Sequence, residues 1–127
     1  MRGDKRPLPL RAVDADQLTD LSSELHDWWL DFDALTFEGR RVVIPIQAEG
    51  QVGKLGWESA PKAFDSRLII EEVTELTSED PEQIGAYTLT QIREKNGSLT
   101  SVAEPNLVIE ARVDAIHVVA EALDALE

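Results

Sequence analysis

The side chains most capable of chemistry lie between Ser22 and Gln47, around one of only two histidines. His26 stands beside Asp27 and close to Asp31, and imidazole and carboxylate groups are common ligands of divalent metals. The same side chains can instead end a helix and hydrogen-bond to the next strand. Because neighbouring carboxylates arise by chance in so acidic a chain, this second interpretation is favoured. We expect no metal here and keep His26 and Asp27 as candidate ligand-binding residues.

Two further residues are candidate ligand contacts. Trp57 lies in the segment from Glu49 to Asp65, which lacks clear periodicity, and long connections of this kind are often functional. The alternative is that this aromatic side chain only anchors the segment to the core. Glu72 shares its strand parity with Leu68 and Ile70, and a carboxylate among apolar neighbours could act as a general acid or base. A bulge, or a charge that protects a sheet edge, is the alternative for Glu72.

Motifs of known catalytic chemistry are absent from the sequence. There is no phosphate-binding glycine loop, no nucleophile elbow, no HExxH motif and no cysteine. Without cysteine, disulfides and thiolate metal sites are excluded. His117, between Ile116 and Val118, is expected to be the outward residue of a strand. We assign no catalytic residue and no cofactor.

An amphipathic helix must position His26. Four apolar residues recur at spacings of three and four, which places them on one helical face: Leu18, Leu21, Leu25 and Trp28. Asp14 is a suitable N-cap residue, and Gln17 can reach back to the amide of Asp14, as in a capping box. Because neighbouring side chains point in different directions, Trp28 is expected in the core and Trp29 outside it.

A strand, a turn and a second strand follow this helix. A bulge near Asp33-Ala34 would reconcile the apolar pattern of the first strand, and Glu38-Gly39 is expected to form the turn. The second strand alternates apolar with other residues, at Val42, Ile44 and Ile46. Pro45 has no amide hydrogen, which places this strand at a sheet edge or gives it a bulge. An edge strand at Pro45 could also join two copies of the chain in a homodimer.

β-Favouring segments dominate the second half of the chain. Arg67 to Thr77 is expected to form one strand, and Asn96-Gly97 indicates a hairpin. Leu107 to Val118 is expected to form another strand, with a short C-terminal helix after it. The predicted fold class is α+β, with an N-terminal helix packed on a mainly antiparallel sheet of about six strands.

Charge is distributed unevenly along the chain. Residues 1–11 contain four basic residues and are expected to form a flexible arm, whereas residues 12–127 form one domain with 8 basic and 24 acidic residues. A body this acidic repels phosphate backbones, which argues against nucleic-acid binding. No apolar run approaches the roughly 20 residues of a membrane span, and no signal peptide is visible. We therefore expect a cytoplasmic protein without membrane contact.

A helix ending in Leu-His-Asp-x-Trp, followed by a strand, a turn and the strand VVIPI, resembles a group of small uncharacterised bacterial proteins. Some of these are grouped with immunity proteins of polymorphic toxin systems. The resemblance covers Leu25 to Ile46, with weaker similarity in LIIEEV and NLVIEARVDAIHV. It implies a β-rich fold and supplies no catalytic residues. Trp29 and the basic arm depart from the pattern of the group.

Together these features favour a non-enzymatic, acidic interaction protein, for example an immunity-type inhibitor of a basic protein partner. Complementary charge would raise the association rate and the selectivity of such an inhibitor. The alternative is a small-molecule or metal-binding domain, which could be enzymatic, with its site near His26 and Asp27. A deep pocket holding His26 and a second carboxylate would favour the alternative, and a broad acidic face would favour the interaction protein.

Overall fold

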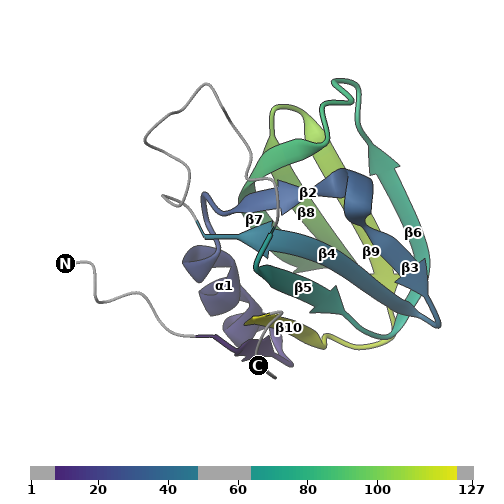
Figure 1. The fold of residues 1–127 in the computed structure, drawn as a ribbon. Coiled ribbons are helices and arrows are strands. Elements are labelled where there is room, and N and C mark those ends of the chain that lie inside the picture. Colours follow the sequence, from purple (N-terminus) through teal and green to yellow (C-terminus); the bar gives the residue numbers. More distant parts are fainter. Residues whose placement is uncertain (1–7, 49–63, 123–127) are drawn as a thin grey trace.

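Strands dominate residues 8–48 and 64–122, which are the residues that the computed structural model describes (Figure 1). In chain order the elements are β1 (Leu10–Ala12), α1 (Ala15–Glu24), β2 (Trp29–Asp31), the 3-10 helix η2 (Phe32–Ala34), β3 (Thr36–Glu38), β4 (Arg41–Gln47), β5 (Ser66–Ile70), β6 (Val73–Glu79), β7 (Ala86–Lys95), β8 (Ser98–Glu104), β9 (Leu107–Val113) and β10 (Val118–Ala122). Trp57 lies outside the described residues.

The strands belong to one sheet in which each pairing between described strands is antiparallel. The order is β1-β10-β5-β4-β2-β7-β8-β9-β6, and β3 pairs with β4 beside this path. The α+β class and the mainly antiparallel sheet are confirmed, but the expected number of about six strands is too low, because the described residues form ten. The number rises because bends and a 3-10 turn divide expected strands into shorter ones, and because β1 forms where the arm was expected.

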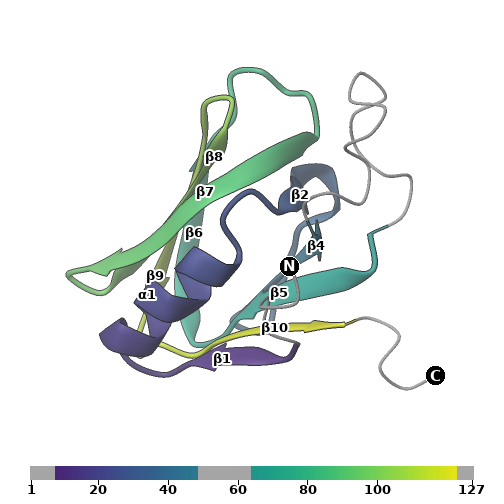
Figure 2. The same cartoon turned by 90° about the vertical axis from the view of Figure 1, so that its left-hand side faces the viewer.

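Two bends fold the sheet back on itself. β5 passes into β6 across Glu71 and Glu72, and β9 passes into β10 across residues 114–117. Because β5 pairs with β10 and β6 pairs with β9, both bends lie at the same corner. The sheet therefore curls around one hydrophobic core, as the two views in Figures 1 and 2 show.

The bend between β5 and β6 changes the expected position of Glu72. Arg67 to Thr77 does not form one straight strand, and Glu72 has a φ of 62° and an exposed side chain. The expectation that Glu72 points toward apolar neighbours is wrong, because the alternation that begins at Leu68 stops at the bend. The alternative of a local irregularity is closer to the structure, which also has a register shift between Val73 and Glu75.

Helix α1 covers the side of the curled sheet between β7 and β1 (Figure 2). Its buried face carries Leu18 and Leu21, and Leu25 is buried at the C-cap. The side chain of Asp14 accepts a hydrogen bond from the backbone N–H of Gln17, as expected for an N-cap. The Gln17 side chain accepts from the N–H of Val13 rather than from Asp14, so the reciprocal bond of the expected capping box is displaced by one residue.

Both ends of the described chain are strands rather than the expected arm and helix. Leu10 and Arg11, assigned to the arm, lie in β1, which pairs with β10. The segment after Val118 is not a helix, because β10 continues to Ala122 between β1 and β5. The helical spacing of Ile116, Val119 and Ala120 is overridden by sheet partners on both sides of β10.

The hairpin predictions are confirmed in outline. Gly39 and Arg40 both have positive φ and connect β3 to β4 in a two-residue turn, and Asn96 and Gly97 do the same between β7 and β8. The bulge expected near Asp33 is instead the 3-10 helix η2. This turn changes the direction of the chain, so β2 and β3 pair with different parts of β4.

Pro45 lies in an interior strand, which corrects the expected sheet edge and the homodimer that depended on it. β4 pairs with β5 on one side and with β3 and β2 on the other. On that second side β3 pairs with residues 41–43 and β2 with residues 46–47, so Pro45 occupies the gap between two partner strands. A residue without an amide hydrogen is tolerated in this gap because the ladder needs no donor there.

The two adjacent tryptophans provide a test of the predicted core. Trp28 is 5% exposed and Trp29 is only partly buried. We expect Trp28→Ala to lower the free energy of unfolding by about 3–5 kcal/mol, because it leaves a large cavity. Trp29→Ala should cost clearly less. Urea unfolding of the two variants checks this assignment, and equal losses would contradict it.

Candidate functional site

A groove between α1 and β7 is the candidate site. It has a volume of about 490 Å³. The helix side and the turn after it contribute Thr19, Ser22, Ser23 and His26, and β7 contributes residues 90–93. Of the three proposed residues that the structure describes, His26, Asp27 and Glu72, only His26 lines this groove.

The walls of the groove are held together by a buried side-chain hydrogen bond. The hydroxyl of Ser22, on α1, accepts a hydrogen bond of 2.9 Å from the backbone N–H of Ile92 in β7. The pairing of β7 with β8 shifts register between Leu89 and Gln91, so Thr90 is an extra residue in β7. A bulge of this kind redirects side chains at the edge of a site. Here it brings Thr90 and Gln91 to the groove.

The junction between α1 and β2 places His26 at one end of the groove. The N–H of His26 donates to the carbonyl of Ser23 at 3.4 Å, which closes the helix end. Asp27 has a φ of 74°, and its N–H donates to the carbonyl of Leu89 at 2.7 Å. The N–H of Leu89 in turn donates to the carbonyl of Trp28 at 2.8 Å. The main chain of this junction thus ends the helix and binds β7, whereas the sequence suggested that the side chains of His26 and Asp27 would do so and would bond to the next strand.

The side chains of His26 and Asp27 contact each other and face solvent. Nδ1 of His26 lies 3.1 Å from Oδ2 of Asp27, and the two side chains are 55% and 46% exposed. Within residues 8–48 and 64–122, no group of three or more His, Cys, Asp or Glu side chains is placed to hold a metal ion. Asp31, considered above as a third ligand, lies in β2 opposite Ala86.

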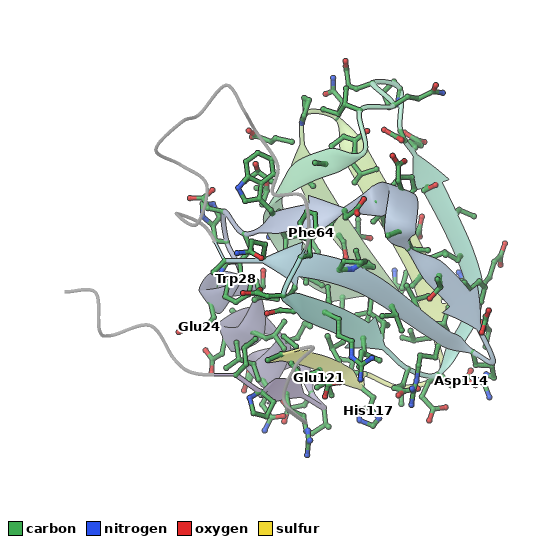
Figure 3. All side chains as sticks on the ribbon, in the orientation of Figure 1. Glu24, Trp28, Phe64, Asp114, His117 and Glu121 are labelled. Carbon is green, nitrogen blue, oxygen red and sulfur yellow. The ribbon has the colours of Figure 1, made fainter. Side chains whose placement is uncertain are left out.

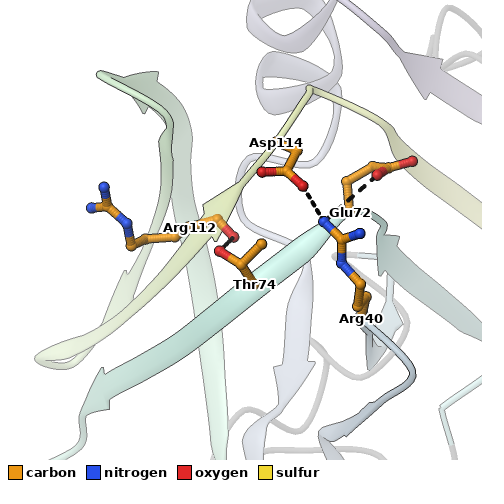
Figure 4. Close-up of polar contacts among 5 residues, drawn as sticks. All are labelled: Arg40, Glu72, Thr74, Arg112 and Asp114. Atoms are coloured by element: carbon orange, nitrogen blue, oxygen red, sulfur yellow. Dashed lines mark hydrogen bonds and ion pairs between the residues drawn. The ribbon is translucent and has the colours of Figure 1, made fainter.

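Glu72 lies away from the groove, at the corner where the sheet bends (Figure 4). Arg40, in the turn between β3 and β4, forms ion pairs with Glu72 at 3.9 Å and with Asp114. Backbone bonds join the same segments, because Val73 N–H donates to the Arg40 carbonyl and Asp114 N–H donates to the Glu72 carbonyl. These contacts hold the bend, and they do not bring Glu72 to His26.

The remaining sequence candidates are also separated from the groove. His117 lies in the connection between β9 and β10 rather than on a strand, and its carbonyl accepts a hydrogen bond from the N–H of Glu71. Figure 3 shows His117 near Asp114 and far from Trp28. Trp57 lies outside the described residues, so the ligand contact suggested for it stays a prediction.

Tyr87 is a buried titratable residue that the sequence did not single out. Its hydroxyl donates to Oδ1 of Asp80 and accepts from the N–H of Ile84, and its ring packs edge-on against Phe32. Burial, together with the bond to Asp80, raises the pKa of Tyr87 above its ordinary value. The alternation of Tyr87 with Leu89 signals an inward position, but its partner Asp80 could be identified only from the structure.

Comparisons of the chain with protein-family models, with curated proteins and with solved structures found no match. No helix among the described residues is long and apolar enough to cross a membrane. The function must therefore be inferred from the geometry and charge of the molecule itself.

Two buried serines test how far the wall of the groove depends on hydrogen bonding. Ser22→Ala should lower the free energy of unfolding by about 1–3 kcal/mol, because the N–H of Ile92 loses its acceptor. Ser101 on β8 is the matched control, since its hydroxyl is buried and has no partner among the described residues. Ser101→Ala should leave stability unchanged or raised in urea unfolding. A larger loss for Ser101→Ala than for Ser22→Ala would contradict this assignment.

The raised pKa of Tyr87 predicts a loss of stability in alkali. In the unfolded chain the pKa of a tyrosine is about 10, and in the folded protein the pKa of Tyr87 is higher. The stability that the neutral Tyr87 side chain contributes is therefore fully present below pH ~10 and is lost as pH rises through the folded pKa. Tyr87→Phe should cost about 1 kcal/mol at neutral pH through the lost hydrogen bonds. The difference between the two proteins should shrink above pH ~10. The measurement is urea unfolding of both proteins across this pH range. A difference in unfolding free energy that stays constant up to strongly alkaline pH would contradict the assignment of the raised pKa to Tyr87.

Proposed function

We propose that this chain is a non-enzymatic interaction protein that presents an acidic surface to a basic protein partner. One observation carries the proposal, namely the exposed side of α1. Asp16 and Asp20 are exposed there, Asp14 caps the start of the helix, Glu24 ends it, and no lysine or arginine occurs between Ala15 and Glu24.

The arrangement of these acids is unfavourable for the helix itself. Asp16 and Asp20 are four residues apart, as are Asp20 and Glu24, and like charges at this spacing destabilise a helix by about 0.2–0.5 kcal/mol per pair. Glu24 also stands at the end of the helix where the dipole favours positive charge. A helix selected only for its own stability would carry lysines near Asp16 and Asp20, so the charge of these two aspartates supports a role outside the molecule.

Several acids elsewhere are paired with arginines, whereas Asp16 and Asp20 on α1 have no such pair among the described residues. Arg41 pairs with Glu71, Arg67 pairs with Glu121, and Arg40 binds the two acids of the corner. In the described part of the chain, no ion pair joins Asp16 or Asp20 to a basic residue. The field of this face is therefore available to attract a positively charged protein and raise its association rate.

The groove gives less support to the alternative, a small-molecule or metal-binding domain, which could be enzymatic. That alternative required a deep pocket with His26 and a second carboxylate. The described residues that line the groove include no carboxylate, and the arginine among them is Arg93. An immunity-type inhibitor of a basic toxin is the specific form of the proposal that the resemblance of Leu25 to Ile46 suggests.

The proposal is tested by removing charge from α1. The full-length protein, immobilised in a lysate of its native cell, should capture a basic protein at low salt and release it at high salt. Asp16→Asn with Asp20→Asn should lower the association rate of the captured protein about tenfold at low salt, because steering is lost. The matched control is Glu75→Gln with Glu110→Gln, which removes the same charge from the outer face of β6 and β9. Equal rates for the two double variants, or binding that is independent of salt, would contradict the proposal.

A further inference from the structure

We propose that the groove between α1 and β7 binds an oxyanion, in the form of a carboxylate or phosphate group of a ligand. The inference is independent of the acidic face, because Asp16, Asp20 and Glu24 do not line the groove. It depends on Arg93, on the hydroxyl groups around it and on the shape of the wall that β7 forms.

Arg93 supplies the positive charge. Its side chain is exposed and lines the groove, and it forms no ion pair with any other described residue. Three other arginines, Arg40, Arg41 and Arg67, are each paired with acids. An arginine that stays without a carboxylate partner in so acidic a protein can offer its planar guanidinium to an external oxyanion, and such bonds are among the stronger hydrogen bonds in proteins.

Hydroxyl groups supply the additional donors. Ser22 accepts the N–H of Ile92 with its oxygen, so its own hydroxyl proton remains available to donate. Ser23 and Thr90 add two hydroxyls from the two opposite walls. A guanidinium with several hydroxyl donors matches the acceptor-only chemistry of an ionised carboxylate or phosphate.

Acceptor groups near the groove that would repel an oxyanion already have other partners. The carbonyls of Leu21 and Ser23, at the end of α1, already accept the N–H groups of Leu25 and His26. The carboxylate of Asp27 lies 3.1 Å from Nδ1 of His26 and is not among the residues that line the groove. The described lining residues therefore present donors to the cavity without a competing carboxylate.

The size of the groove indicates that the oxyanion belongs to a larger molecule. Sites for small molecules have volumes of roughly 300–1,000 Å³. The groove, at about 490 Å³, falls within this range and exceeds the space that one oxyanion needs. Gln91 and the imidazole of His26 can then contact the polar remainder of the ligand.

The experiment is a titration of the isotope-labelled full-length protein, followed through its backbone amide NMR signals. Sodium phosphate and sodium acetate are the two probes, each added at constant ionic strength against sodium chloride as the reference. We expect saturable shifts at residues 22–23 and 90–93. Tighter binding of phosphate would indicate a phosphoryl ligand and tighter binding of acetate a carboxylate ligand, and either order supports an oxyanion site.

Arg93→Gln is the decisive variant, and Arg112→Gln is its matched control. Arg112 is an exposed arginine on β9, outside the groove, so both changes remove one positive charge from the surface. Arg93→Gln should weaken binding of the preferred probe about tenfold, and Arg112→Gln should change it less than twofold. The absence of saturable shifts with both probes, or equal weakening by the two variants, would overturn the proposal.

Discussion

The bend shared by β5–β6 and β9–β10 is the constraint on which the rest of the structure depends. At a bend, backbone groups leave the strand ladder and must find other partners. The turn at Arg40 provides one of them, since its carbonyl accepts the N–H of Val73, while the carbonyls of Glu72 and His117 accept the N–H groups of Asp114 and Glu71. With these groups satisfied, β6 can lie against β9 while β5 lies against β10, and the sheet can enclose a core.

The ion pairs of Arg40 contribute to this corner mainly by selecting its geometry. Arg40 and its two partners have side chains that are about half exposed, and pairs of this kind contribute little to stability individually. The buried contacts provide most of the stabilisation, because Val42, Ile70 and Val73 on either side of the corner are fully buried or nearly so. The arginine fixes which three segments meet, and the apolar side chains stabilise their meeting.

Helix α1 completes the enclosure and at the same time creates the two surfaces of functional interest. Its apolar face closes the core, its solvent face carries acids, and its edge toward β7 carries serine and threonine hydroxyls. The acidic face and the groove with Arg93 therefore lie on neighbouring sides of one element, with opposite charge. A partner must match both the negative face and the positive groove. Such a pair of charges therefore fixes the orientation of the partner as well as attracting it.

Local patterns of the sequence determined much of the fold. Three predicted features depend only on nearby residues, and all are present in the structure. They are the helix indicated by the spacing of Leu18, Leu21 and Leu25, its N-cap at Asp14, and the hairpins at Gly39 and Asn96-Gly97. The acidity of the chain and the inward position of Val42, Ile44 and Ile46 are likewise read directly from residue types and alternation.

Only the tertiary structure decided the features that depend on distant partners. Glu72 turned outward because a bend is stabilised by Arg40 and Asp114, which are remote in sequence, and periodicity contains no information about such partners. The segment after Val118 became a strand because β1 and β5 offered it hydrogen bonds on both edges. Arg93 and His26 line one groove for the same reason, since a bulge in β7 and the hydroxyl of Ser22 join two elements that local sequence cannot relate.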